Sequence, residues 1–85
     1  MTDATTLLAL SPGQSGIVLG YSGGRGLASR LAAMGFVPGA EVTIVNNYRG
    51  GPILVLVHGS RIALGRGEAA HVSVRPLAPV AAPKA

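Results

Sequence analysis

The chain has 85 residues, no cysteine and a net charge of +4, and these values exclude several classes of protein. A chain of this length forms one domain at most and buries only about 60% of the surface that its unfolded state exposes. Without cysteine it has neither a disulfide framework nor a thiolate zinc site, so packing or association must stabilise it. Hydrophobic residues make up 48% of the sequence and charged residues 12%, a balance that leaves apolar surface for a partner.

The two ends of the chain differ in composition from its middle. We expect the polar residues 1–6 to be frayed and residues 76–85, rich in proline and alanine, to form a disordered tail. The folded domain then covers residues 7–75. The apolar run from Leu7 to Leu10 is too short for a secretory or membrane-spanning segment, so the sequence predicts a cytoplasmic protein.

Two proline–glycine pairs mark turns ahead of strands. Pro12-Gly13 and Pro38-Gly39 each place a fixed φ before a residue that tolerates positive φ, as a type II turn requires. The first strand is predicted over residues 14–20. Its alternation puts three side chains on one face: Ile17, Leu19 and Tyr21.

A helix is predicted next, over residues 25–34, because the hydrophobic period changes there. Leu27, Leu31 and Met34 fall at positions i, i+4 and i+7, which form one stripe of a helix. Gly35 stands where a left-handed C-terminal cap is favoured.

The rest of the chain predicts short strands. We expect strands over 41–46, 53–57, 61–65 and 71–75, with a helical turn over 66–70. In the connection His58-Gly59-Ser60, glycine at the first turn position suits a type II′ hairpin. Closing strands this short into a barrel removes their unpaired edges. The predicted fold is therefore all-β, a small SH3-like barrel of about five strands with one short α-helix between the first two.

The residues that could carry chemistry are few and badly spaced for it. His58 and His71 are the only histidines, and no set of three or four ligands has metal-site spacing, which a zinc or iron site usually needs. No serine is matched with a histidine and an acid in the pattern of a catalytic triad. The glycine-rich segment 20–26 follows a strand and precedes a helix, but it lacks the third glycine of a dinucleotide motif and the lysine of a P-loop. We therefore expect no enzyme, no catalytic residue, no metal site and no cofactor.

The basic residues do not predict a nucleic-acid surface. They are spread over the whole chain, and the aromatic residues on which bases would stack number only three. A basic small barrel that binds nucleic acid stays as the alternative function, because the net charge of +4 favours anionic partners.

The segment 53–57 is the most informative part of the sequence, because all five of its residues are apolar. A strand with one face in water should alternate, so something outside the barrel must cover one of its faces. If Ile53, Val55 and Val57 face inward, then Leu54 and Leu56, with Val45, form an outward stripe. The stripe binds either a partner or a second copy of the chain; alternatively, the N-terminal segment around Leu7 to Leu10 folds over it.

Several separated blocks of the sequence resemble one family. They are 30–39 (RLAAMGFVPG), 41–45 (EVTIV), 51–53 (GPI), 61–64 (RIAL) and 69–74 (AAHVSV). In this order and spacing they resemble the ferrous iron transport protein A (FeoA) family over residues 7–76. The related SH3-like domain of iron-dependent repressors fits part of the pattern, but that family's helix-turn-helix and metal-binding domains are absent from this sequence. The chain departs from the family at Ala32 and Ala33, where a larger apolar residue is common after Leu31.

The resemblance implies a cytoplasmic accessory or regulatory protein of ferrous iron uptake. Its partner would be the large membrane ferrous-iron permease that carries a GTPase domain, the FeoB type, which would recruit it to the inner face of the membrane. Combining this with the apolar stripe, we expect the partner-binding residues to be Leu54, Leu56, Val45, Arg25 and Arg30. A homo-oligomer through the same stripe is compatible with this hypothesis.

Overall fold

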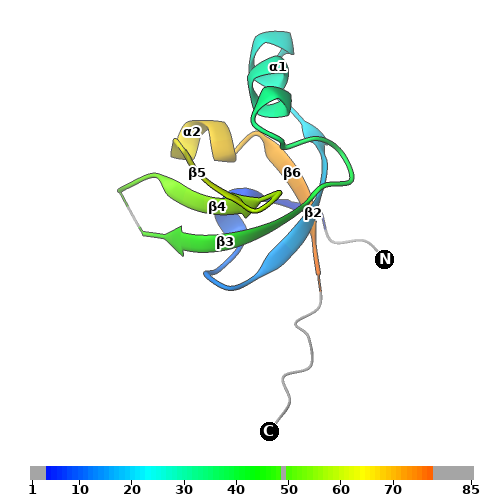
Figure 1. Ribbon diagram of the computed structural model, residues 1–85. Coiled ribbons are helices and arrows are strands. Elements are labelled where there is room, and N and C mark those ends of the chain that lie inside the picture. The colour runs from blue at the N-terminus through cyan, green and yellow to red at the C-terminus, as the bar shows by residue number, and fades with distance from the viewer. Residues whose placement is uncertain (1–3, 49, 78–85) are drawn as a thin grey trace, which may run out of the picture.

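An antiparallel sheet curled into a barrel dominates the computed structural model, which describes residues 4–48 and 50–77 (Figure 1). Over these residues the sheet has six strands in the order β1-β6-β2-β3-β4-β5. The elements in chain order are β1 (Thr5–Thr6), η1 (Leu7–Ala9), β2 (Ser15–Tyr21), α1 (Arg25–Ala33), β3 (Glu41–Asn47), β4 (Ile53–Val57), β5 (Ser60–Leu64), α2 (Arg66–Ala69) and β6 (Val72–Pro76). This mostly β architecture, with α1 between the two strands predicted as first and second, confirms the predicted fold class.

The ends of the described chain differ from the prediction. Thr5 and Thr6 pair with Val74 and Ser73 of β6, so the prediction of a frayed segment 1–6 is wrong for these two residues. Pro76 belongs to β6, and the amide of Leu77 donates to the carbonyl of Ser15 at 2.9 Å. Residues 1–3 and 78–85, on which the rest of both predictions falls, lie outside the described part of the chain.

A β-bulge in β2 overturns the predicted face of that strand. The register against β6 shifts between Val18 and Gly20, which makes Leu19 the extra residue. Before the bulge Ile17 lies opposite exposed Arg75, and after it Tyr21 lies opposite buried Val72. Residues opposite each other in an antiparallel pair share a face, so Ile17 and Tyr21 face opposite sides of the sheet. One inserted residue has reversed the alternation.

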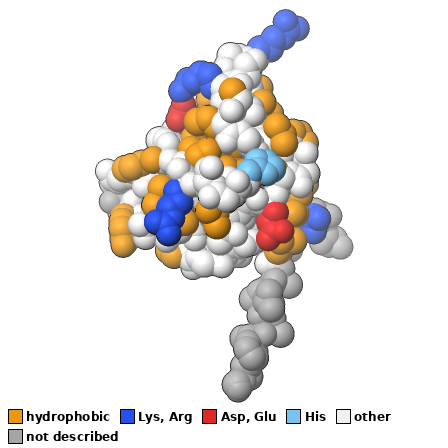
Figure 2. All heavy atoms as spheres, viewed as in Figure 1, with side chains coloured by type: hydrophobic (Ala, Val, Ile, Leu, Met, Phe, Trp, Pro, Cys, Tyr) orange, Lys and Arg blue, Asp and Glu red, His pale blue; other side chains and the backbone are white. Residues whose placement is uncertain are grey.

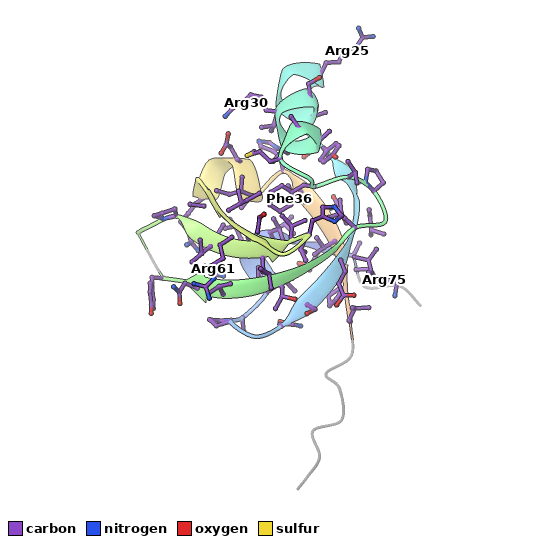
Figure 3. All side chains as sticks on the ribbon, viewed as in Figure 1. Arg25, Arg30, Phe36, Arg61 and Arg75 are labelled. Atoms are coloured by element: carbon purple, nitrogen blue, oxygen red, sulfur yellow. The ribbon has the colours of Figure 1, made fainter. Side chains whose placement is uncertain are left out.

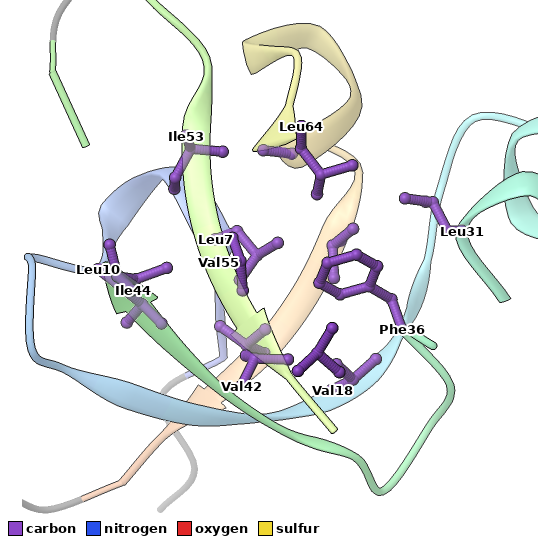
Figure 4. Close-up of a cluster of buried hydrophobic side chains, with 14 of the residues drawn as sticks. Leu7, Leu10, Val18, Leu31, Phe36, Val42, Ile44, Ile53, Val55 and Leu64 are labelled. Atoms are coloured by element: carbon purple, nitrogen blue, oxygen red, sulfur yellow. The ribbon is translucent and has the colours of Figure 1, made fainter. Parts of the chain in front are cut away.

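The core fills the barrel from end to end (Figure 4). Inward side chains of the strands supply most of it, and η1, α1 and the segment after α1 close its ends. Its fully or almost fully buried members include Leu7, Leu10, Val18, Leu31, Phe36, Val42, Ile44, Ile53, Val55, Val57, Leu64, Val72 and Val74. No polar or charged residue among those described is buried in it, so the barrel is held by apolar packing.

The turns that precede β2 and β3 follow the sequence prediction. Gly13 and Gly39 have φ of 88° and 93°, and each turn closes with a backbone hydrogen bond of 2.9 Å, from Gln14 to Ser11 and from Ala40 to Val37. These values confirm type II turns at both proline–glycine pairs.

The hairpin between β4 and β5 differs from the prediction. Val57 pairs with Ser60, so the two-residue loop is His58-Gly59 and β5 begins one residue earlier than expected. Both loop residues have positive φ, 51° and 78°, which is the signature of a type I′ turn and not of type II′. The prediction was wrong because it placed glycine first in the loop; a non-glycine residue takes that position.

The helix α1 projects from the barrel (Figure 1), and we call it the arm. Leu31 is its one buried residue, and Leu27 and Met34 pack against the core with part of their surface, as the predicted stripe requires. Gly35 follows the C-cap with φ of 100°, which confirms the predicted end of the helix. No helix among the described residues is long and apolar enough to cross a membrane.

Candidate functional site

The strand β4 alternates between a buried and an outward row although all its residues are apolar. Ile53, Val55 and Val57 are buried in the core, which confirms the orientation assumed from the sequence. Leu54 is half-buried and Leu56 is 37% exposed on the opposite face. Strand β4 therefore presents leucine to the outside at two successive outward positions.

The neighbouring strands determine what surrounds these leucines. Leu56 lies between Thr43 of β3 and Arg61 of β5, and Leu54 lies opposite Ala63 of β5. On β3 the register shifts between Ile44 and Asn46, so Val45 is an extra residue. It precedes Asn46, which lies opposite Leu54. Val45 is half-buried. We call Val45, Leu54 and Leu56 the leucine stripe.

The N-terminal segment does not cover the leucine stripe. Leu7 and Leu10 are buried inside the barrel, where they close one end of the core (Figure 4). The side-chain amide of Asn47 fixes the segment there by donating to the carbonyls of Leu8 and Leu10, at 3.1 and 2.8 Å. The interpretation that this segment folds over the stripe is therefore wrong, because Leu7 and Leu10 belong to the core and Leu8 packs against it.

Arg61 is a basic residue next to the stripe that the sequence prediction missed. It is exposed on β5, and its position opposite Leu56 sets a guanidinium group at the edge of an apolar surface (Figure 3). The correct turn type between β4 and β5 would have placed Arg61 opposite Leu56. A loop of His58-Gly59 pairs residue 56 with residue 61, whereas a loop that began at Gly59 would have shifted this register.

The two arginines that the sequence assigned to the site lie on α1. Arg25 is at the first turn of the helix and points away from the barrel, so the structure separates it from the leucine stripe (Figure 3). Arg30 forms an ion pair with Glu68 of α2. The predicted residues thus fall into two groups, an apolar group on the barrel and a basic group on the arm.

Basic side chains are scattered over the surface. On the face drawn in Figure 2 they lie far apart, while hydrophobic side chains are exposed over the sheet between them. Arg66 is engaged with the loop between β3 and β4, donating to the carbonyls of Tyr48 and Gly51 at 2.8 and 3.2 Å. This distribution offers no continuous track for a phosphate backbone on that face.

The histidines have structural surroundings. His71 Nδ1 lies 3.0 Å from Ser22 Oγ, at the connection between β2 and α1. His58 occupies the β4–β5 turn, and its ring lies next to Gly35. Across residues 4–48 and 50–77, no three His, Cys, Asp or Glu side chains come together as a metal site would need.

Comparisons with known proteins agree on one family. The family model described as "FeoA domain" matches residues 5–76. The chain is 36% identical over 62 residues to a protein of Methanocaldococcus jannaschii named Fe(2+) transport protein A, covering 73% of this chain and 74% of that protein.

Solved structures show the same likeness. A crystal structure described as an iron uptake regulatory protein (FeoA) matches with a TM-score of 0.84 and 37% identity, over 88% of this chain and 100% of that one. The zinc complex of Stenotrophomonas maltophilia FeoA matches with a TM-score of 0.72 and 36% identity, over 82% and 88% of the two chains. That protein is described as an SH3 domain protein and a candidate activating factor of ferrous iron transport. Because the matched region spans β1 to β6, the whole barrel together with its arm, the chain belongs to the FeoA family of ferrous iron transport and has that family's SH3-like fold.

Proposed function

We propose that this protein is a cytoplasmic accessory protein that regulates ferrous iron uptake by docking on a FeoB-type membrane permease with a GTPase domain. Membership of the FeoA family supports the link to ferrous iron transport. One observation supports docking above the others: Leu56 is 37% exposed on a strand whose alternate residues are all buried. Single exposed leucines are common on protein surfaces, but Leu56 shares its face with the half-buried Leu54, and a partner would cover the two side chains together.

The leucine stripe has the composition of an interface centre. Full burial of a leucine side chain stabilises by about 1.5 to 3 kcal/mol, and the partly covered residues of the stripe each have a fraction of that still to gain. Arg61 adds a group that is enriched at interfaces, since a guanidinium group packs on apolar surface and binds carboxylates in a fork. The proposed surface is therefore the leucine stripe with Arg61 at its border.

Arg25 and Arg30 form a second proposed contact, on the arm. Arg25 is exposed and free of the barrel, which suits a long-range attraction to an acidic partner. Arg30 contributes less, because its guanidinium group already binds Glu68. In this proposal the protein only binds, and the permease carries out the transport and any GTP hydrolysis.

Co-purification of the full chain with the permease tests the main surface. The double substitution Leu54→Glu with Leu56→Glu places two carboxylates in the interface and should abolish co-purification while the circular dichroism of the free protein stays unchanged. The matched control is Leu19→Glu, a leucine that is 42% exposed on the β2 bulge, outside the stripe. Binding of the double variant at the wild-type level, or equal loss in the control, would refute the proposed surface.

Charge reversal tests the arm separately. Arg25→Glu should slow association and weaken binding most at low salt, because rim charges act mainly on the association rate. Arg30→Glu should have the smaller direct effect on association. An effect of Arg25→Glu that does not change with ionic strength would argue against an electrostatic contact of the arm.

A further inference from the structure

The strand β5 forms an open edge of the sheet. In the order β1-β6-β2-β3-β4-β5 it is the last strand and pairs with β4 alone. An edge strand presents unpaired N–H and C=O groups to which another strand can pair. At the opposite end of the sheet β1 has only two residues, so β5 is the longer of the two edges.

The register identifies which backbone groups of β5 are free. Val57 and Ser60 flank a two-residue loop, so they exchange hydrogen bonds, and bonding then alternates along the ladder. Ser60, Ile62 and Leu64 therefore bond to β4, while the amides and carbonyls of Arg61 and Ala63 point away from it. Among the described residues these groups have no backbone partner in a turn, loop or cap.

The edge also lacks two features that block strand addition, proline and a β-bulge. The segment Ser60–Leu64 contains no proline, and its register against β4 runs without a bulge. Arg61 and Ala63 are exposed, and their side chains share the outward face with Leu56 and Leu54. The free edge is thus continuous with the leucine stripe.

We propose that β5 binds an extended segment of the partner as an added strand, with an acidic side chain of that segment opposite Arg61. The inference rests on the proposed function and gives its docking mode. The added strand would take the free groups of Arg61 and Ala63 and lay its outward side chains next to the leucine stripe. Main-chain hydrogen bonds would give affinity, and the acid at Arg61 with an apolar residue at Ala63 would give specificity.

Charge favours a foreign acidic strand over a second copy of this chain. A symmetric pairing that uses both free residues places Arg61 of each copy opposite Ala63 of the other. The two Arg61 residues are then diagonal neighbours about 7 to 8 Å apart, so their guanidinium groups are within reach of each other. The chain carries a net charge of +4, so the two copies also repel each other as a whole. An acidic segment would instead attract both the Arg61 side chain and the positively charged chain as a whole.

Hydrogen exchange on the full chain tests the docking mode directly. In the free protein the amides of Arg61 and Ala63 should exchange much faster than those of Ile62 and Leu64, as measured by NMR. In complex with the full detergent-solubilised permease, mass spectrometry with fragmentation to single residues should show the amides of Arg61 and Ala63 slowed at least about tenfold.

Two substitutions at one position separate the backbone from the side chain. Ala63→Pro removes an amide that β4 does not use, and proline is tolerated on the free side of an edge strand, so the fold should survive. It should weaken permease binding by about tenfold, because the complex loses one main-chain hydrogen bond. The control Ala63→Val keeps the amide and should bind within about threefold of wild type. Arg61→Glu should weaken binding by at least about tenfold through repulsion of the acid.

The outcomes distinguish this inference from the proposed function. A complex in which the amides of Arg61 and Ala63 keep their free exchange rates overturns strand addition and leaves docking intact. Absence of any complex with wild-type protein overturns the proposed function itself. Protection of these amides in the free protein that rises with its concentration would show a second copy on the edge, and this also overturns the proposal. Protection that appears only with the permease, and that is reduced at the Arg61 amide in Ala63→Pro, supports it.

Discussion

The guanidinium group of Arg30 on α1 forms an ion pair with the carboxylate of Glu68 on α2, which joins the two helices outside the barrel. The other carboxylate oxygen of Glu68 accepts the amide of Gly65, at the start of α2, at 3.4 Å. The Arg30 side chain is 67% exposed and that of Glu68 is 25% exposed, so water and salt screen the pair. The contact thus orients the arm more than it stabilises the barrel.

A double-mutant cycle measures this ion pair. Arg30→Ala should lower the free energy of unfolding by at most about 1 kcal/mol, because the pair is exposed. Glu68→Ala should cost more, since the amide of Gly65 loses its acceptor as well. The coupling energy from urea unfolding should lie at about 0.2 to 1 kcal/mol and shrink in about 1 M salt. A coupling that salt leaves unchanged would contradict this account of a screened contact.

Two leucines distinguish the core from the proposed docking surface. Leu64 at the end of β5 is fully buried, while Leu56 is 37% exposed on the outer face. Leu64→Ala should lower the free energy of unfolding by about 2 to 5 kcal/mol, because it leaves a cavity. Leu56→Ala leaves none and should cost less than about 1.5 kcal/mol. Chemical denaturation of both variants measures the difference, and equal costs would show that the leucine stripe is part of the core.

The sequence was sufficient for the elements whose signals are local. The proline–glycine turns, the helix ended by Gly35 and the strands β3 to β6 are confirmed, because each depends on turn residues or on a hydrophobic period within a few positions. The short strand β1 was missed for the opposite reason. Thr5 and Thr6 are polar and pair with Val74 and Ser73, about seventy residues away, and no local pattern signals such a partner.

The candidate site was predicted only in its apolar part. The unbroken run Ile53–Val57 revealed Leu54 and Leu56, because a strand that is apolar at every position must have two apolar faces. Arg61 was missed because the residue opposite Leu56 depends on the turn type, and a histidine at positive φ is uncommon. The bulges in β2 and β3 change the faces of Tyr21 and Asn47, and no residue type in the sequence marks either of them.

Neighbouring asparagines at the end of β3 should differ sharply in their contribution to stability. Asn47 donates to the carbonyls of Leu8 and Leu10, whereas Asn46 lies opposite Leu54 on the outer face. Asn47→Ala leaves two carbonyls without this donor and should lower the free energy of unfolding by about 1 to 3 kcal/mol. Asn46→Ala is the matched control and should change it by less than about 0.5 kcal/mol. Thermal unfolding measures both, and similar losses would mean that the Asn47 hydrogen bonds do not anchor the N-terminal segment.

Gly35 should be the less replaceable of two glycines that share a left-handed backbone. Gly35 has φ of 100°, and a Cβ there would lie 3.0 Å from Cδ2 of His58. Gly13 has φ of 88°, but a Cβ there would have no neighbour within 4 Å. Gly13→Ala should therefore cost only backbone strain, about 1 to 2 kcal/mol, whereas Gly35→Ala should cost that strain and the displacement of the His58 ring.

Removing the ring tests the cause of the difference between the two glycines. His58→Gly deletes the imidazole and suits the positive φ of 51° at that position. In the Gly35→Ala background, His58→Gly should raise the free energy of unfolding by more than it does in wild type. In the Gly13→Ala background, it should change the free energy of unfolding by the same amount as in wild type. Equal costs of the two alanine substitutions in urea unfolding would show that the ring moves aside freely. The arm and the β4–β5 hairpin would then be independent, and the contact between Gly35 and His58 would not position α1.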